Sequence, residues 1–338
     1  MVEPGPVSEY TAVRKGGAGL IDFSSRGRIN ISGTEAVPFL NGLITNDVKT
    51  LELNSWVTAA FPNVQGRLLA AVRVLHTSAG YLLDTEATTS GKVLELVKRF
   101  TLAGDFQVAD LTASTASISI QGTGSSRIIK ALLGEGAADV ERQRIVQTQL
   151  PDGAAVNVMR ASHTGEDGFD LFTNAENAPS LWEALIAAGA QPVGLPTLEV
   201  LRIEAGLPRY GVDMDETSIV LETMLDDAVS FTKGCYIGQE IIARITHRGH
   251  VAKKLTGLRF AGEVRIEEGA KIRSVDGKEI GRVTSATYSP HLGRTIALGY
   301  VKYDFLAPGT VVQIISSAEE IAAEVAELPF VRGSWYSN

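Results

Sequence analysis

The amino-acid sequence predicts an α+β protein in which a mixed helix-and-strand region is followed by a smaller all-β domain. Its 338 residues exceed what one ordinary hydrophobic core accommodates, so we expect two or three domains. Helix-like and strand-like patterns alternate over residues 20–245, whereas turn signals recur about every ten residues further on. We therefore expect a loose polar lead-in over residues 1–19, an α+β region over 20–245 and a β domain over 246–338.

The overall composition is that of an ordinary globular protein, with 44% hydrophobic and 21% charged residues. The net charge of −8 argues against strong, sequence-independent binding of nucleic acid phosphates. One local basic patch is either a contact for nucleic acid or a solvated face beside a domain junction. It comprises Arg244, His247, Arg248, His250, Lys253 and Lys254.

The use of cysteine and the hydropathy pattern bear on where the protein resides. Cys235 is the single cysteine, which excludes an internal disulfide and any zinc or iron–sulfur site held by this chain's thiolates alone. No apolar run approaches the roughly 20 residues that cross a bilayer, and the start of the chain has no basic segment before an apolar core. We expect a cytoplasmic protein that does not bind membranes.

The first half of the α+β region opens with a strand and a helix. Arg28–Ser32 alternates between apolar and polar residues as a half-buried strand does. Thr34 is a natural N-cap for the helix that follows. The apolar stripe of that helix comprises Val37, Phe39, Leu40 and Leu43. Further strands are predicted at Leu68–Leu75 and Tyr81–Leu83, and Thr89 is predicted to cap a second helix.

The second half of this region repeats the alternation. Gly122-Thr123-Gly124 resembles a phosphate cradle, but it lacks the third glycine of a dinucleotide fingerprint, so we expect a plain start of the helix Ser125–Leu133. The other predicted strands and helices are Phe106–Leu111, Ala116–Gln121, Arg144–Leu150, Ala154–Arg160, Ala178–Ala188 and Thr197–Ala205.

Short β-branched runs characterise the C-terminal part. Leu298–Val301 and Val311–Ile315 lie between turn signals such as Asp276-Gly277 and Pro308-Gly309. This pattern predicts a small all-β barrel or sandwich.

The stretch Lys233-Gly234-Cys235-Tyr236-Ile237-Gly238-Gln239-Glu240 is the first candidate site. A thiol just before a helix start lies near the positive end of the helix dipole, and Lys233 adds a second positive charge. Both effects favour the reactive thiolate. We take Cys235 and Lys233 as candidate catalytic residues, and keep open the alternative that Cys235 is a small buried apolar residue.

Two more segments combine glycines with acidic or aromatic residues. In Thr164–Asp170 a tight turn brings Glu166 and Asp170 close together, either as solvated acids of a hairpin or as ligand contacts. In Arg202–Asp213 the helix stops at a glycine, and Tyr210 could stack on a planar ligand. From the residues alone, Arg202 and Glu204 are interpreted as a salt bridge at this helix stop.

No metal site is predicted. His247, His250 and Cys235 form a nominal set of three ligands, but a glycine interrupts the helical face and no second thiol is present. A Cys–His nucleophilic pair stays open, because a thiol needs only a nearby base. The possible bases are His76, His163, His247, His250 and His291.

The octapeptide at 233–240 resembles the signature of the YgfZ family, folate-binding proteins related to the glycine-cleavage T-protein, an aminomethyltransferase. Thr45-Asn46-Asp47-Val48 is similar to the T-protein segment "LTTNDV", residues 164–170 to "YTGEDGFE", and residues 202–213 to "RLEAGLPLYGHD". The resemblance extends from Leu20 to about Val301.

The resemblance implies a bilobed folate-binding region and a C-terminal β-barrel, arranged like three leaves around a central channel. In T-proteins the last acid of "YTGEDGFE" binds the pteridine ring of folate, and Asp170 falls at that position. Glu166, Tyr210 and Arg202 are further candidate folate contacts. The implied cofactor is tetrahydrofolate or a derivative, and the implied partners are iron–sulfur proteins or their assembly machinery.

Two departures from the T-protein pattern bear on activity. Lys92 falls where T-proteins carry an essential aspartate, although a shift of register brings Asp84 or Glu86 near instead. A lysine only donates hydrogen bonds and cannot replace that acid. Leu198 replaces an arginine that assists pteridine binding. We therefore interpret the protein as a folate-binding accessory factor for iron–sulfur enzymes, without aminomethyltransferase turnover. The alternatives are a working tetrahydrofolate-dependent aminomethyltransferase or other one-carbon enzyme, and a thiol-dependent redox or repair enzyme.

Overall fold

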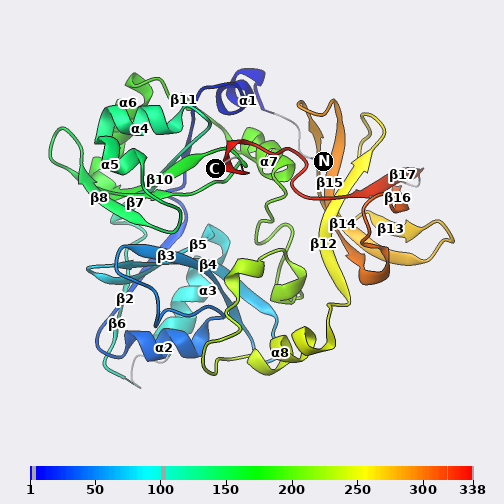
Figure 1. Cartoon of the computed structure of the whole chain (residues 1–338), viewed down its shortest axis with the longest axis horizontal. Coiled ribbons are helices and arrows are strands. Elements are labelled where there is room, and N and C mark those ends of the chain that lie inside the picture. The colour runs from blue at the N-terminus through cyan, green and yellow to red at the C-terminus, as the bar shows by residue number, and fades with distance from the viewer. Residues whose placement is uncertain (2–4, 100–103, 318, 337–338) are drawn as a thin grey trace.

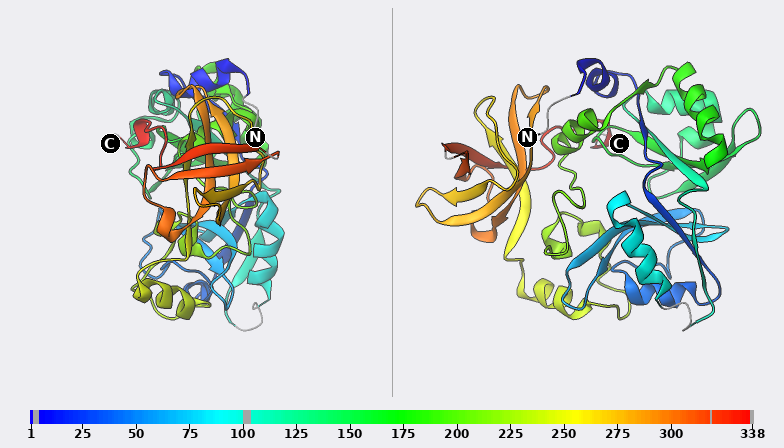
Figure 2. Two further views of the ribbon diagram at one scale, coloured as in Figure 1. Left: turned by 90° about the vertical axis from the view of Figure 1, so that its right-hand side faces the viewer. Right: turned by 180° about the vertical axis from the view of Figure 1, so that it is seen from behind.

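The computed structural model describes residues 1, 5–99, 104–317 and 319–336, which form three lobes (Figure 1). Two lobes are α+β and the third is a β-barrel. Seen from behind, the three lobes lie around the middle of the molecule like leaves (Figure 2). The predicted fold class, an α+β region followed by a β-barrel, is confirmed.

The first lobe is a five-stranded antiparallel sheet with the order β3-β4-β5-β2-β6. Its strands are β2 (Gly27–Ser32), β3 (Ser55–Pro62), β4 (Leu68–Thr77), β5 (Gly80–Thr85) and β6 (Gln107–Asp110). Two helices, α2 (Ala36–Leu43) and α3 (Ala87–Lys98), pack Leu40 and Val93 into the same hydrophobic core as the sheet.

The second lobe is a six-stranded sheet with the order β11-β1-β7-β10-β9-β8, in which only the β1–β11 pair is parallel. Its strands are β1 (Gly19–Asp22), β7 (Thr115–Gln121), β8 (Ile145–Gln149), β9 (Ala155–Arg160), β10 (Gly168–Asn174) and β11 (Gln191–Pro192). Its helices are α4 (Ser125–Leu133), α5 (Glu135–Ala138) and α6 (Ala178–Ala187). Ile129 of α4 and Leu185 of α6 lie in one core with Phe169 of β10.

The third lobe is a closed six-stranded barrel with the order β12-β15-β14-β13-β16-β17, which decides between the predicted barrel and sandwich. Its strands are β12 (Lys253–Phe260), β13 (Lys271–Ser274), β14 (Glu279–Ser289), β15 (Arg294–Lys302), β16 (Val311–Ser316) and β17 (Glu319–Ala326). Inward side chains such as Leu258 and Val283 fill the interior. Closure removes the exposed strand edges that an open sheet would present.

Three further helices connect or flank the lobes, namely α1 (Val7–Arg14), α7 (Leu195–Glu204) and α8 (Gln239–Arg248). Short 3₁₀ helices are η1 (Ala175–Asn177), η2 (Val220–Glu222), η3 (Asp226–Ala228), η4 (Tyr303–Phe305) and η5 (Ser334–Tyr336). The last segment of the chain returns from the barrel to the second lobe, where the backbone N–H of Trp335 donates to the carbonyl oxygen of Gly165. The barrel and the second lobe are therefore joined by this returning segment as well as by their sequential connection.

The lead-in was predicted as loose, and this is wrong for residues 7–14, which form α1. The hydroxyl of Tyr10 lies 2.8 Å from both carboxylate oxygens of Glu204, a fully buried residue of α7. Arg14 donates to the same carboxylate, and so does the hydroxyl of Ser289 in the barrel. A buried charge has to be paired, so this carboxylate orders a segment that its own sequence leaves undefined.

Two predicted helix caps and the predicted domain boundary differ from the structure. Thr34 does not cap α2, because its hydroxyl donates to Asp105 and the helix starts at Ala36. Thr89 lies inside the first turn of α3, two residues after its start. The predicted domain boundary after residue 245 falls inside α8, and the barrel begins at Lys253.

Candidate functional site

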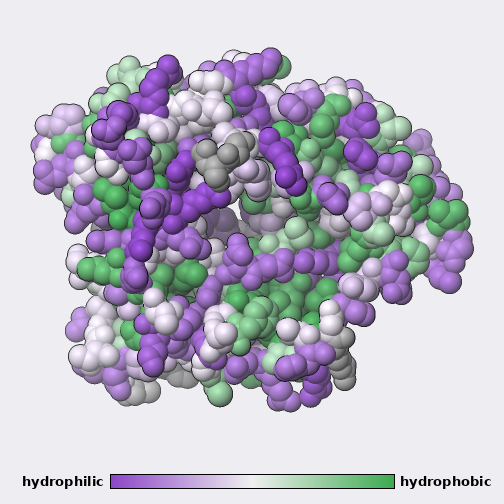
Figure 3. Space-filling view, in the orientation of Figure 1, coloured by the Kyte–Doolittle hydropathy of each residue, from purple (hydrophilic) through white to green (hydrophobic). Residues whose placement is uncertain are grey.

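A pocket of about 350 Å³ lies where the first two lobes meet α7 and the segment that follows it. The space-filling view shows a hollow in the middle of the molecule (Figure 3). The lining comes from residues 22–26, from the N-terminal end of α3, from His163, and from residues 195–212. We call this the central pocket. Its size falls within the range of small-molecule sites.

One wall of the central pocket is aromatic and apolar. Tyr210, Leu198 and Phe23 all line it. The hydroxyl of Tyr210 donates to the carbonyl oxygen of Leu68 at 3.3 Å, and burial raises the pKa of this tyrosine. Because its hydroxyl is bonded to the first lobe, the ring of Tyr210 is held at the pocket, and its stacking role stays a prediction.

Arg202 lines the central pocket and is also a structural ion-pair partner. Its guanidinium donates to Glu199 at 2.7 Å and to Asp213 at 2.5 Å. The hydroxyl of Ser285 in β14 accepts a third bond at 2.7 Å. The predicted salt bridge of Arg202 with Glu204 is wrong. The two residues are two positions apart on α7 and therefore point to different sides of the helix. Glu204 pairs with Arg14 instead. Arg202 instead ties α7 to the barrel beneath the pocket.

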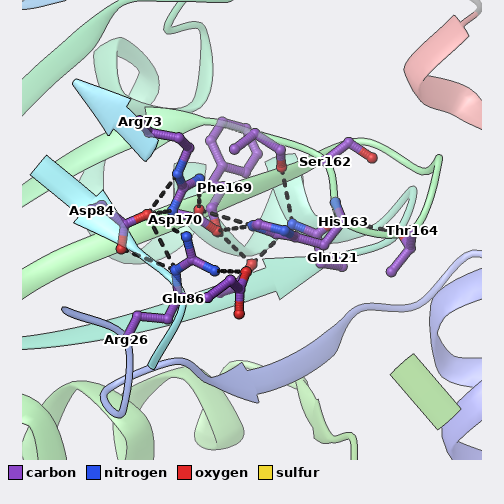
Figure 4. Close-up of polar contacts among 12 residues, drawn as sticks. Arg26, Arg73, Asp84, Glu86, Gln121, Ser162, His163, Thr164, Phe169 and Asp170 are labelled. Atoms are coloured by element: carbon purple, nitrogen blue, oxygen red, sulfur yellow. Dashed lines mark hydrogen bonds and ion pairs between the residues drawn. The ribbon is translucent and has the colours of Figure 1, made fainter. Parts of the chain in front are cut away.

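A chain of alternating charges runs along the junction of the two α+β lobes (Figure 4). Arg26 donates to Asp84 at 2.9 Å and also pairs with Glu86. Arg73 lies between two carboxylates, donating to Asp84 at 2.7 Å and to Asp170. Of these residues, Arg26 and Glu86 line the central pocket.

Asp170 occupies the buried end of this chain. It is fully buried on β10, and its oxygens accept from Arg73 and lie 2.9 and 3.1 Å from Nε2 of His163. Burial by itself raises the pKa of Asp170, but His163 and Arg73 hold that pKa far below its usual range. Asp170 does not line the central pocket, whereas His163 does. The residue predicted to contact folate is thus screened by its own neighbours.

Glu166 also lies outside the central pocket. Its carboxylate accepts from Arg14 and from both the backbone N–H and the hydroxyl of Ser334. Burial raises the pKa of Glu166, and these hydrogen bonds lower it below its ordinary value. The predicted folate contact is therefore occupied in anchoring α1 and the C-terminal segment to the turn at 164–168.

The carboxylate nearest the start of α3 is Glu86 and not a residue in the middle of the helix. Lys92, predicted to fall at the acid position of T-proteins, lies outside the pocket lining and pairs with Glu216 on the surface. Glu86 precedes the first helical residue and lines the pocket. The structure therefore favours the register in which Glu86, and not Lys92, faces the pocket.

The octapeptide at 233–240 lies against the first lobe, where the backbone N–H of Ile237 donates to the carbonyl oxygen of Gly42. Cys235 is exposed. The ammonium of Lys233 points inward, donating to the carbonyl oxygens of Ile44 at 2.8 Å and Asn46 at 2.6 Å. Burial lowers the pKa of Lys233 to about 8. Neither Cys235 nor Lys233 lines the central pocket.

No group of three metal-ligating side chains is found among the described residues. His250 stacks on Tyr303 with ring centroids 3.7 Å apart and bonds a backbone carbonyl through Nδ1.

Among the residues that the structure describes, no helix is long and apolar enough to cross a membrane. The basic patch is partly neutralised, because Arg244 pairs with Glu240 and Lys254 with Asp226.

The sequence left several pocket residues unassigned. Arg26, Phe23 and Asp22 precede β2 in a segment without a recognisable motif, and nothing in the local pattern marks them. His163 was weighed only as one of five possible bases. Its position directly before Thr164-Gly165 is the signal that could have assigned it to the folate segment.

Comparison with protein families matches nearly the whole chain. Residues 2–233 match the family model described as "GCVT N-terminal domain". Residues 253–332 match "Glycine cleavage T-protein C-terminal barrel domain". The two matched ranges lie on either side of α8, and the second range begins at Lys253, where the barrel also begins.

Curated relatives and a solved structure give the same result. An aminomethyltransferase of Rubrobacter xylanophilus is 34% identical over 326 residues, covering 96% of this chain and 86% of the relative. An aminomethyltransferase of Thermotoga neapolitana is 31% identical over 337 residues, covering 96% and 89%. The crystal structure of the glycine cleavage system aminomethyltransferase T from Bartonella henselae superposes with a TM-score of 0.86 at 24% identity, covering 96% of this chain and 89% of that one. The last match concerns the fold alone.

Proposed function

Because this chain belongs to the family of the glycine cleavage T-protein, we propose that it binds tetrahydrofolate in the central pocket. The observation that carries the proposal is the lining of one cavity. His163, directly before the 164–170 segment, and residues 207–212 of the segment that resembles the T-protein "RLEAGLPLYGHD" line the same pocket of about 350 Å³.

The chemistry of the pocket suits a pterin ring. An aromatic face at Tyr210 and apolar side chains at Leu198 and Phe23 offer a surface for a flat heterocycle. Polar groups at Arg26, Glu86 and His163 stand at the edge of the same cavity. A mostly apolar cleft with a few directed polar groups is the usual form of a cofactor site.

Calorimetric titration with tetrahydrofolate tests the proposal. We expect micromolar affinity, on the order of −8 kcal/mol. Tyr210→Ala should weaken binding by about 1 kcal/mol, the usual contribution of an aromatic contact. The matched control is Tyr303→Ala, since Tyr303 stacks on His250 in the barrel and does not line the pocket. No heat with the wild-type protein, or equal losses in both variants, would contradict the proposal.

Two uses of the bound folate are each favoured by one observation. Aminomethyl transfer is favoured by the names of the relatives and by the carboxylate of Glu86 at the pocket wall. An accessory role for iron–sulfur enzymes, of the YgfZ kind, is favoured by the exposed thiol of Cys235 within the octapeptide. The thiol lies outside the pocket, so this second use requires a partner that meets the octapeptide surface.

The two uses give opposite results with the same pair of variants. Aminomethyl transfer predicts turnover with tetrahydrofolate and an aminomethylated lipoyl protein, lost in Glu86→Gln and kept in Cys235→Ala. The accessory role predicts no turnover, and a loss of iron–sulfur enzyme activity in cells that carry Cys235→Ala. Turnover at the level of a buffer blank would rule out the first use. Full complementation by Cys235→Ala would rule out the second.

A further inference from the structure

His163 stands between a buried carboxylate and the central pocket. Its Nε2 atom lies 2.9 Å from Oδ2 and 3.1 Å from Oδ1 of Asp170, and His163 is also one of the residues that line the pocket. Asp170 is fully buried and is held from behind by Arg73. The close-up shows the histidine and Arg73 on different sides of this carboxylate (Figure 4).

The imidazole ring is fixed in place. Phe23 meets it edge-on, with ring centroids 4.7 Å apart. The backbone N–H of His163 donates to Oε1 of Gln121 at 2.9 Å, which fixes the main chain at this residue. The side chain keeps 22% of its surface exposed. Among the described residues, no hydrogen bond is made by Nδ1 of His163.

The partner of Nε2 determines which tautomer the neutral ring adopts. Asp170 is ionised, because the guanidinium of Arg73 donates a hydrogen bond to it, and an ionised carboxylate only accepts hydrogen bonds. Nε2 must therefore carry the ring proton. Nδ1 of the neutral ring is left with a lone pair, and it is the ring nitrogen that remains free to meet a ligand.

We propose that His163 is a ligand-recognition residue that accepts an N–H group of a planar heterocycle through Nδ1, with Asp170 as the positioning residue that fixes its tautomer. The inference rests on the proposed function, since the ring N–H and amino groups of a reduced pterin are donors of this kind. It assigns to His163 the polar contact that the sequence resemblance gave to Asp170. Asp170 acts only through the histidine.

Two substitutions separate the roles of the two ring nitrogens. His163→Gln places an amide N–H where Nε2 meets Asp170 and removes the acceptor, so tetrahydrofolate should bind about 10-fold or more weakly. His163→Asn restores an acceptor near the position of Nδ1 and should recover part of that loss. Equal affinities of wild type and His163→Gln would overturn the proposal.

A measurement on the free protein separates this proposal from the one on folate. In ¹⁵N spectra of the ring of His163 without ligand, Nε2 should be the protonated nitrogen of the neutral form and Nδ1 the unprotonated one. Asp170→Asn should mix the two tautomers, while unfolding curves report whether that variant folds. If the neutral ring of the wild type is protonated at Nδ1, or is an even mixture of the two tautomers, the proposed roles of His163 and Asp170 are wrong, whatever the affinity for folate. Failure of tetrahydrofolate to bind alongside the expected spectrum would instead defeat the proposed function and leave the tautomer assignment intact.

Discussion

The ammonium of Lys233 lies 2.8 Å from the carbonyl oxygen of Ile44, at the end of α2 in the first lobe. The carbonyl oxygen of Asn46 accepts a second bond from the same group at 2.6 Å. Lys233 is 8% exposed, so these bonds are made away from water. The first residue of the octapeptide is thus a fixture between that segment and the first lobe, and the predicted effect of its charge on Cys235 stays a prediction.

Lys233→Met should destabilise the protein. The substitution leaves two backbone carbonyl groups without their donor, and an unsatisfied buried acceptor costs about 1–3 kcal/mol. Urea unfolding of the two proteins measures the difference in the free energy of unfolding. Lys254→Met is the control, because Lys254 pairs with Asp226 at the surface and should change stability by less than about 1 kcal/mol. Equal stabilities of Lys233→Met and wild type would show that the bonds of Lys233 contribute nothing.

The contribution of Lys233 should depend on pH with a defined sign. Burial lowers its pKa to about 8, against 10.5 in the unfolded chain. Between these values the unfolded state binds more protons than the folded state, so the free energy of unfolding rises with pH. The stability of wild type minus that of Lys233→Met should therefore increase from about pH 8 to about pH 10 and stay level below that interval. A difference that falls with rising pH would contradict the burial of a charged amine.

Cys235 should react without unfolding, because it is exposed. Titration of the native protein with a disulfide reagent should consume one thiol, and denaturant should reveal no more. Cys235→Ala should change the free energy of unfolding by less than about 0.5 kcal/mol, as surface substitutions do. It should also leave the affinity for tetrahydrofolate unchanged, since the thiol does not line the pocket. A thiol that reacts only after denaturation would identify Cys235 as a packing residue.

Glu86 and Lys92 should differ sharply in their effect on folate binding. Glu86 lines the central pocket and pairs with Arg26, so Glu86→Gln removes a charge from the pocket wall. We expect a change of about 1–3 kcal/mol in binding free energy, typical of hydrogen bonds to charged groups. Lys92→Ala breaks only a partly exposed pair with Glu216 and should leave the affinity within about twofold. A larger loss of affinity in Lys92→Ala than in Glu86→Gln would instead support the alignment that places Lys92 at the folate.

Local patterns in the sequence were sufficient for the fold class. Gly206 follows the end of α7 with a φ of 68°, as the helix-stop signal indicated, whereas α8 begins at Gln239, four residues after Cys235 and not directly after it. Alternation and turn spacing predicted the barrel strands. These features depend on residues only a few positions apart, whose sterics and hydrogen bonding are already present in the local chain.

Which acidic groups line the central pocket, and which are enclosed, was decided by tertiary structure. Arg73 and Asp170 are 97 positions apart, and Lys233 and Ile44 are 189 apart, yet these pairs determine which way each side chain turns. A local motif shows which acids and glycines are neighbours in the sequence, but it does not show which carboxylate pairs with a distant arginine. Because buried charges must be paired, those long-range partners enclosed Asp170 and Glu166, turned Lys233 inward, and left His163 and Glu86 to face the central pocket.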